Sequence, residues 1–229
     1  MLDRVLARLR RTWLDPFHIS HSTIERALRR HAAMIRGRTL DIGCGEKPYR
    51  RLFPSAKPYW GTETSHTFVR RSGADVTALG EALPFADGIF EGIVCTEVLE
   101  HVPDPSAFLA EVFRVAAPGA VVLLTTPQTW GLHEEPYDFY RYTKYGLYHL
   151  FTRTGLQILD VSPTTGTLAT VGQRLSSFCF YELGGRRRAL KPVAAIASAA
   201  IQLLFYAGDA AFGHRGDTLD WVVLARKPV

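Results

Sequence analysis

The chain has 229 residues and a net charge of +5, with 47% hydrophobic and 21% charged residues. This length and composition are typical of a folded globular enzyme and exclude a disordered chain. Its three cysteines lie far apart, which excludes a disulfide framework or zinc ribbon and indicates a reducing, cytoplasmic setting. Nucleic acid is not expected as a partner, because no basic stripe alternates with stacking aromatics.

Two helices are expected within residues 1–36, before the first strand. In the first of them, aliphatic residues share one helical face and arginines flank it: Leu2, Val5, Leu6 and Leu9, with Arg4, Arg8, Arg10 and Arg11. This pattern indicates either a basic amphipathic helix on an anionic membrane or a short helix packed on the domain, and not a secretory signal. Residues 22–36 predict the second helix, with Ser22 or Thr23 as its N-cap and an apolar face of Ile24, Ala27, Leu28 and Ile35.

The most informative stretch is residues 39–45, where an apolar run ends in Asp41 and is followed by Gly43 and Gly45. Glycine lets the backbone approach a ligand closely where a side chain would collide. Residues 46–48 then predict the start of a helix, because proline suits the first helical turn.

A second short strand is predicted over residues 58–63 and ends in Glu63. An open parallel sheet places an acid at this point against a ribose diol. Pro48 stands where a dinucleotide fingerprint has Gly or Ala, which disfavours a pyrophosphate on the helix N-terminus.

Strands and helices alternate as far as residue 126, which indicates a parallel sheet covered on both faces. Beyond this point, a helix is expected from residue 143 and a strand at 156–161. The loop at 129–142 is rich in polar and aromatic side chains, and it follows a central strand, where open sheets place substrate chemistry.

A long insertion, residues 164–215, precedes a last strand at 218–226. It carries a basic link at 184–188 and an alanine-rich apolar stretch at 192–207. We expect this stretch to be a buried or homodimer-forming helix, and a segment in the lipid headgroup region is the alternative. The predicted organisation is N-terminal helices, a main domain and a helical insertion, over 1–36, 37–163 with 216–229, and 164–215.

These motifs together resemble class I S-adenosylmethionine-dependent methyltransferases, in particular the small-molecule group called type 11. The resemblance covers about residues 37–163 and the last strand, and it implies that residues 89–95 are the fourth strand, 108–116 the following helix and 118–127 the fifth strand. It implies an α/β, Rossmann-like sheet of seven mostly parallel strands with an antiparallel last strand, helices on both faces and a helical insertion. It also implies S-adenosylmethionine as cofactor, held by Asp41, Gly43, Cys44, Gly45, Glu63, Glu81, Ala82, Thr96 and Glu97.

One position departs from the family pattern. Leu79 stands where many members carry an Asp that holds the adenine amino group. The adenine would then depend on backbone groups around Glu81 and Ala82, with Asp75 as a substitute.

The resemblance implies direct methyl transfer to a small-molecule, lipid-linked or saccharide acceptor, with alignment supplying most of the rate. His101 and His133 are candidate bases for a hydroxyl acceptor, and Tyr137, in the loop of His133, is the third catalytic candidate. Glu97, Glu100 and His101, with His133, resemble the metal cluster of methyltransferases acting on quinone precursors or RNA ends. Similar strings occur in members without a metal, and no metal is expected.

Two other classes of protein are alternatives. A catalytically inactive, membrane-associated binding module with the same fold would be consistent with Leu79. A nicotinamide-dependent oxidoreductase would share the sheet and the ribose acid, but it is opposed by Pro48. The expected location is the cytoplasm, with peripheral membrane contact as an addition.

Overall fold

The computed structural model describes residues 12–65, 73–184 and 190–229. The predictions for the first eleven residues and for the arginines of the basic link therefore lie outside the described residues.

The chain divides into two compact units. We call residues 27–162 and 221–229 the sheet unit, and residues 163–220 with the chain up to Arg26 the helical unit. This division differs from the predicted organisation. The insertion shares a unit with the N-terminal residues, whereas residues 27–36 belong with the sheet.

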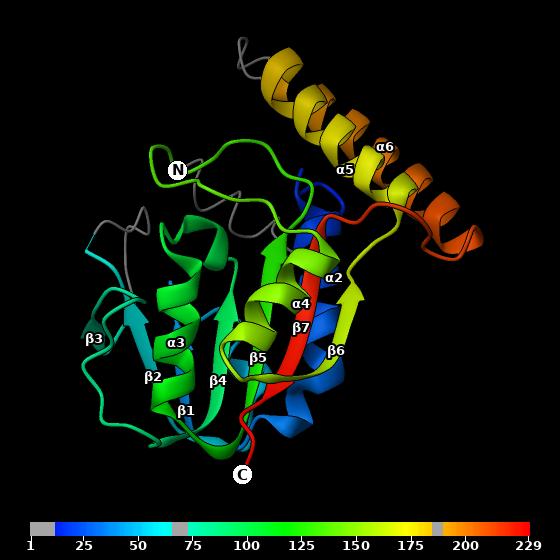
Figure 1. Cartoon of the computed structure of the whole chain (residues 1–229). Coiled ribbons are helices and arrows are strands. Elements are labelled where there is room, and N and C mark those ends of the chain that lie inside the picture. The colour runs from blue at the N-terminus through cyan, green and yellow to red at the C-terminus, as the bar shows by residue number, and fades with distance from the viewer. Residues whose placement is uncertain (1–11, 66–72, 185–189) are drawn as a thin grey trace. The chain divides into compact units, whose positions relative to one another are not determined.

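Seven strands form one mixed sheet in the order β3-β2-β1-β4-β5-β7-β6 (Figure 1). Strands β1 to β5 pair in parallel, and the last strand is antiparallel, so the predicted Rossmann-like sheet is confirmed. The strand bounds are β1 Gly37–Ile42, β2 Ala56–Glu63, β3 Val76–Thr77, β4 Phe90–Thr96, β5 Ala116–Pro127, β6 Gln157–Pro163 and β7 Asp220–Arg226.

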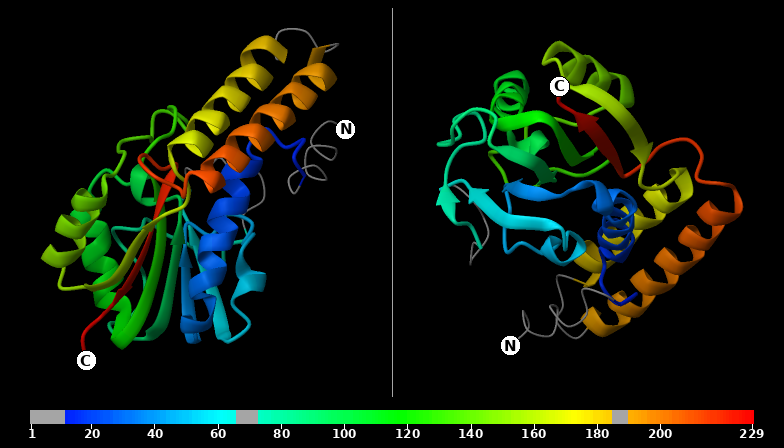
Figure 2. Two further views of the ribbon diagram at one scale, coloured as in Figure 1. Left: turned by 90° about the vertical axis from the view of Figure 1, so that its right-hand side faces the viewer. Right: turned by 90° about the horizontal axis from the view of Figure 1, so that it is seen from below.

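Helices cover the central strands because those strands are apolar on both faces. Helices α3 (Pro105–Val115) and α4 (Lys144–Arg153) lie on one face of the sheet, and the part of α2 from Ala27 onward lies on the other (Figures 1 and 2). Helix α3 begins at Pro105 because the Asp104 carboxylate accepts hydrogen bonds from the N–H groups of Ser106 and Ala107, both at 3.0 Å. Its apolar face is buried through Phe108, Leu109, Val112 and Val115.

The helix predicted to begin at residues 46–48 does not form, and this expectation was wrong. Only a short 3-10 helix, Arg50–Leu52, lies between β1 and β2. Lys47 has a left-handed φ of 54° just before Pro48, and Pro54 then stops the segment six residues later. Because a residue that precedes proline disfavours the helical region, the segment between the two prolines is too short for an α-helix.

The helix before β1 starts earlier than predicted. Helix α2 spans His18–His31, followed by a 3-10 helix at Ala32–Met34. Thr23 therefore lies inside the helix, and its hydroxyl donates to the Ile19 carbonyl at 2.7 Å instead of capping an end. The predicted inward face is confirmed, since Ile24, Ala27, Leu28 and Ile35 are all buried.

The helical unit contains an antiparallel helix pair. Helix α5 spans Thr167–Phe178 and continues as a π-helix at Cys179–Leu183, and α6 spans Lys191–Ala211. The two helices lie side by side in both views (Figures 1 and 2). The predicted helical insertion is thus present, and α6 is longer than the apolar stretch that predicted it.

Candidate active site

A pocket of about 330 Å³ opens in the sheet unit beyond the carboxyl ends of β1, β2 and β4. In an open sheet the strand order reverses next to β1, and ligands bind at this edge. The pocket is lined by Ile42, Gly43, Gly45, Thr62, Glu63, Thr64, Ala78, Leu79, Gly80, Glu81, Glu97, Val98, His101, Val102, Pro103, Glu134 and Tyr137. Seven of the predicted site residues are in this lining: Gly43, Gly45, Glu63, Glu81, Glu97, His101 and Tyr137.

The glycine turn after β1 forms one wall of the pocket. Gly43 and Gly45 have φ values of 65° and 50°, a region that favours glycine. A Cβ on Gly43 would lie 2.2 Å from Val98 Cγ2. The turn therefore accepts no side chain at Gly43, as the sequence predicted, and its backbone is left bare toward the pocket.

Glu63 crosses from the end of β2 to this turn. Its carboxylate accepts a hydrogen bond from the Gly45 N–H at 3.0 Å and another from the Thr64 N–H at 2.9 Å. The side chain is thus held at the pocket rim, where its oxygens could also accept hydrogen bonds from a ribose diol.

Asp41, the other predicted acid, does not line the pocket. It is buried, and its carboxylate accepts a hydrogen bond from the Tyr59 hydroxyl at 2.7 Å. Burial raises the pKa of Asp41 to about 7, although the Tyr59 hydrogen bond opposes this shift. The two acids therefore do not share one rim in this structure, and a direct contact of Asp41 with the donor stays a prediction.

Cys44, Ala82 and Thr96 also lie outside the lining. Cys44 is buried, and the Ala82 N–H already donates to the Leu79 carbonyl at 3.1 Å. Asp75, the suggested substitute for adenine binding, accepts hydrogen bonds from Lys47 and from the Gly61 N–H instead. Their direct roles in cofactor binding stay predictions.

The pocket wall at residues 78–80 is apolar. Leu79 lines it and is 52% exposed, together with Ala78 and Gly80. An exposed leucine in a pocket wall can pack against a flat ring of a ligand. The departure of Leu79 from the family pattern did not by itself predict this possibility.

Glu97 begins the loop after β4 and has an unusual backbone. Its φ is 54°, a strained value for a residue other than glycine. Its N–H donates to the Thr125 carbonyl at 3.0 Å, and its carboxylate accepts from the Thr125 hydroxyl at 2.6 Å. Strand β5 therefore fixes the position of Glu97 in the pocket wall.

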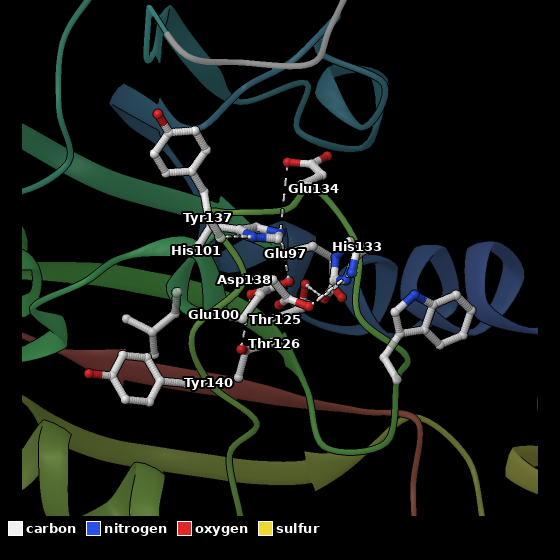
Figure 3. A network of polar contacts seen from close by, with 12 residues as sticks. Glu97, Glu100, His101, Thr125, Thr126, His133, Glu134, Tyr137, Asp138 and Tyr140 are labelled. Carbon is white, nitrogen blue, oxygen red and sulfur yellow. Dashed lines mark hydrogen bonds and ion pairs between the residues drawn. The ribbon is translucent and has the colours of Figure 1, made fainter.

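His101 presents one ring nitrogen to a backbone acceptor. Its Nδ1 lies 2.7 Å from the Tyr137 carbonyl oxygen, so Nδ1 carries the proton in this contact. Nε2 then lies 3.7 Å from Glu100 and 3.9 Å from Glu134 (Figure 3). In the neutral ring this Nε2 is a base or a metal ligand. Tyr137 meets His101 through its backbone, and its phenol points away from the two histidines.

His133 does not line the pocket but packs against His101, with ring centroids 4.7 Å apart and the planes at 75°. Burial and the neighbouring His101 lower the pKa of His133, which favours its neutral form. Asp138 accepts a hydrogen bond from the His133 N–H at 3.0 Å and two from Arg141. Burial opposes ionisation of Asp138, but these contacts outweigh it and lower its pKa to about 2.

Glu100 completes this group. Its side chain is 0% exposed, and one oxygen accepts from the Thr126 hydroxyl at 3.2 Å. The other oxygen, Oε1, has no hydrogen-bond partner among the described residues. Burial and the nearby Glu97 hold the pKa of Glu100 well above its ordinary value. Ligand atoms of Glu100, His101 and His133 lie within 4.8 Å of one another, so this nitrogen and oxygen donor set could hold a divalent cation.

The strand order, the glycine turn and the acid at the end of β2 define a class I methyltransferase fold. The sequence profile of a family described as a methyltransferase domain matches residues 13–173. The chain belongs to this family, and the family and fold assign S-adenosylmethionine as its cofactor.

Individual relatives agree with this assignment. An uncharacterized methyltransferase of Mycobacterium leprae is 36% identical over 105 residues, which are 42% of this chain and 39% of that protein. A ubiquinone biosynthesis O-methyltransferase of Methylococcus capsulatus is 28% identical over 137 residues, which are 50% of this chain and 56% of that protein. The chain thus spans less than two thirds of these curated relatives. A solved S-adenosylmethionine-dependent methyltransferase of Mesorhizobium loti shares the fold, with a TM-score of 0.58 at 16% identity, covering 91% of this chain and 99% of that one.

We predict that Asp41→Asn stabilises the protein more as the pH rises. The pKa of Asp41 in the folded protein is about 7, which is above its ordinary value. The neutral acid therefore makes its full contribution to the free energy of unfolding below about pH 4, and this contribution is lost as the pH rises from 4 to 7. The variant avoids this loss, and its advantage should reach up to roughly 4 kcal/mol. Urea unfolding at several pH values measures it, with the exposed Asp87→Asn as the matched control. A pH-independent difference between Asp41→Asn and the unsubstituted protein would contradict this account of Asp41.

Proposed function

We propose that the chain transfers the methyl group of S-adenosylmethionine to a hydroxyl oxygen of a small-molecule, lipid-linked or saccharide acceptor. The observation that supports it is one pocket that is lined both by Glu63, suited to a ribose diol, and by His101, suited to a hydroxyl proton. A cytoplasmic location fits this class of fold.

The donor would lie across the carboxyl ends of β1, β2 and β4. Glu63 would accept hydrogen bonds from the ribose, the bare turn at Gly43 would allow close approach, and Leu79 would cover the adenine. Glu97, on the same pocket wall, would face the methionine end with a fixed carboxylate. The sulfonium methyl group would then face His101, which lines the same pocket.

The bound donor would supply a sulfonium methyl group, which the acceptor oxygen would take with S-adenosylhomocysteine as the leaving group. His101 Nε2 takes the proton of the acceptor hydroxyl. The contact of Nδ1 with the Tyr137 carbonyl orients the ring for this step. Holding the nucleophile in line with the sulfonium supplies most of the remaining rate.

Glu63→Gln should weaken S-adenosylmethionine binding by about tenfold to a hundredfold, because it replaces charge-assisted hydrogen bonds with neutral ones. Isothermal titration with the donor measures this change. Glu91→Gln is the matched control, since Glu91 is an exposed acid at the opposite end of its strand, bonded to the Arg38 N–H at 2.8 Å. Equal affinity in both variants would remove Glu63 from the donor site. If the unsubstituted protein itself gave no heat, the inactive binding module would become the better description.

His101→Asn should lower the rate by about a hundredfold or more while donor affinity stays unchanged. Asparagine can still donate to the Tyr137 carbonyl but has no group in place of Nε2. The assay incubates protein and methyl-labelled donor with an extract of a strain lacking the gene, and counts label in the lipid and aqueous fractions. His149→Asn, on the exposed side of α4, is the matched control. Full labelling by His101→Asn would exclude His101 as the base.

A cation-assisted reaction is the second candidate, and the unpartnered, buried oxygen of Glu100 favours it. Glu100, His101 and His133 would hold the ion, which would supply positive charge for an acceptor oxygen. His101 Nε2 would then be a ligand, so it could not also be the base, and the two mechanisms exclude each other.

Chelation separates the two mechanisms. If the cation takes part, activity should fall after treatment with a chelator and return with Mg²⁺ or Mn²⁺, and His133→Asn should abolish Mn²⁺ binding by calorimetry without changing donor affinity. Labelling that survives exhaustive chelation would exclude the cation and leave His101 as the base.

A further inference from the structure

We propose that helices α5 and α6 form a docking surface for an anionic phospholipid bilayer, which their exposed apolar side chains enter from one side. This inference concerns the helical unit alone, and it does not depend on the proposed methyl transfer.

The first observation is that α6 buries its polar side chains and exposes its apolar ones. Its exposed residues recur at helical spacing and are apolar: Val193, Ile196, Ala200, Leu203, Leu204 and Ala207. Ile196 is 65% and Leu204 is 70% exposed. The polar residues Ser198, Gln202 and Asp209 are buried instead. A helix on the surface of a protein in water normally shows the opposite arrangement.

Helix α5 repeats this inversion. Val171, Leu175 and Phe178 are exposed at spacings of four and three residues, which places them on one helical face. The residues buried within the unit include Thr170, Gln173 and Ser176. Apolar side chains are thus exposed on both of two adjacent helices, which differs from the scattered exposure that is normal in any protein.

The contact between α5 and α6 has the features of contacts between helices in lipid. Gly172 allows close approach, because a Cβ there would lie 2.3 Å from the Cβ of Phe205. The Ser198 hydroxyl donates to the Ser176 carbonyl at 3.0 Å. Small residues and side-chain hydrogen bonds hold two helices together when lipid surrounds the pair.

Buried glutamines attach the pair to the preceding part of the chain. The Gln202 side chain accepts from the Ile19 N–H at 3.1 Å, and the Gln173 side chain accepts from the Ser20 N–H at 3.2 Å. Both N–H groups belong to the first turn of α2, which has no intrahelical acceptors for them. One side of the pair is therefore occupied by polar contacts with residues 15–20, and the apolar residues are left on other sides.

The charge of this region favours an anionic surface. The sequence of residues 167–211 contains the basic residues Arg174, Arg186, Arg187, Arg188 and Lys191, against the acids Glu182 and Asp209. Arg186 to Arg188 lie outside the described residues, so they enter this argument only as charges in the sequence that links α5 to α6. Asp209 is buried and accepts hydrogen bonds from the Gly166 N–H and from His214. Attraction between basic residues and an anionic leaflet is screened by salt, so binding through this region should weaken as the salt concentration rises.

The same features favour peripheral binding over crossing of the bilayer. Helix α6 is long and apolar enough to span a bilayer, and 22% of an apolar stretch of 18 residues within it is buried. Helix α5 with its π-helical continuation, however, covers only residues 167–183, a length of roughly 25 Å, which is still short of the bilayer core of about 30 Å. It also exposes Arg174, and a charge inside the hydrocarbon is costly.

A second copy of this chain is the competing occupant. Two copies joined through these helices would bring together two regions with the same excess of positive charge, whereas anionic lipid neutralises it. The charge balance therefore decides for the bilayer, and oligomeric state becomes one outcome of the test.

Flotation with vesicles tests the proposal on the full chain. Vesicles of phosphatidylcholine with roughly one third phosphatidylglycerol should carry the protein upward, and pure phosphatidylcholine vesicles or high salt should carry less. Ile196→Ser with Leu204→Ser should weaken binding by about tenfold or more, because two exposed apolar side chains lose their lipid contact. The matched control is Leu132→Ser with Tyr145→Ser, two residues of the sheet unit that are 76% and 80% exposed.

The outcomes are distinct. A protein that stays at the bottom of the gradient, or a helix variant that floats as well as the control, would overturn the proposal. Light scattering that shows a dimer lost in the helix variant, without flotation, would assign the surface to a second copy instead. If the helix variant fails to fold, Ile196→Trp replaces it: its fluorescence should be quenched by brominated lipids, and no added quenching over the unsubstituted protein would also overturn the proposal.

Discussion

The hydrogen bonds from the Gly45 and Thr64 N–H groups to the Glu63 carboxylate are the contacts on which the donor end of the pocket depends. They tie the end of β2 to the turn after β1. That turn can pass close by only because Gly43 carries no side chain where Val98 packs. The Glu63 carboxylate thus connects the ends of β1 and β2, and the missing Cβ of Gly43 lets the loop after β4 pack against them. The pocket lies over these three strand ends. Without a full α-helix after β1, this pocket has no α-helix dipole there, so the proposed donor contacts fall to the turn and Glu63.

The sheet could be predicted from the sequence because its signals are local. Alternating strands and helices, an apolar run before Gly43 and an acid at the end of residues 58–63 need no knowledge of distant contacts. The direction of a buried side chain does need it. Asp41 turns to Tyr59, a partner on the neighbouring strand that spacing alone cannot reveal, so only one of the two predicted acids reaches the pocket. The missing helix after β1 could have been predicted, because Pro48 and Pro54 are visible in the sequence.

The loop residues show the same limit at the catalytic end. The sequence supplied the types of residue, histidines and carboxylates near a strand end, but it could not separate His101, which lines the pocket, from His133, which packs behind it. It also gave no sign that Glu100 would be fully buried with one oxygen unpartnered, or that Glu97 would have a left-handed backbone. Such local costs concentrate in sites where a ligand or a proton compensates them. Glu97 lines the pocket, and Glu100 lies behind it, 3.7 Å from Nε2 of the lining residue His101, which supports this side of the pocket as the place of the chemistry.

The helical unit requires a different argument, because mean hydropathy cannot tell a core helix from a lipid-facing one. Both are long and apolar, and the sequence therefore left residues 192–207 open between core, dimer and membrane. The distinction lies in which face is covered. The buried side of α6 contains Ser198, Gln202 and Asp209, and each of these side chains forms a hydrogen bond inside the unit. Burial of this helix therefore provides partners for its polar side chains and leaves its apolar side chains exposed. In water such an arrangement forgoes the hydrophobic gain that normally stabilises a helix pair. At the bilayer surface proposed for this unit, the same side chains would recover that gain, because their apolar groups would leave water for lipid.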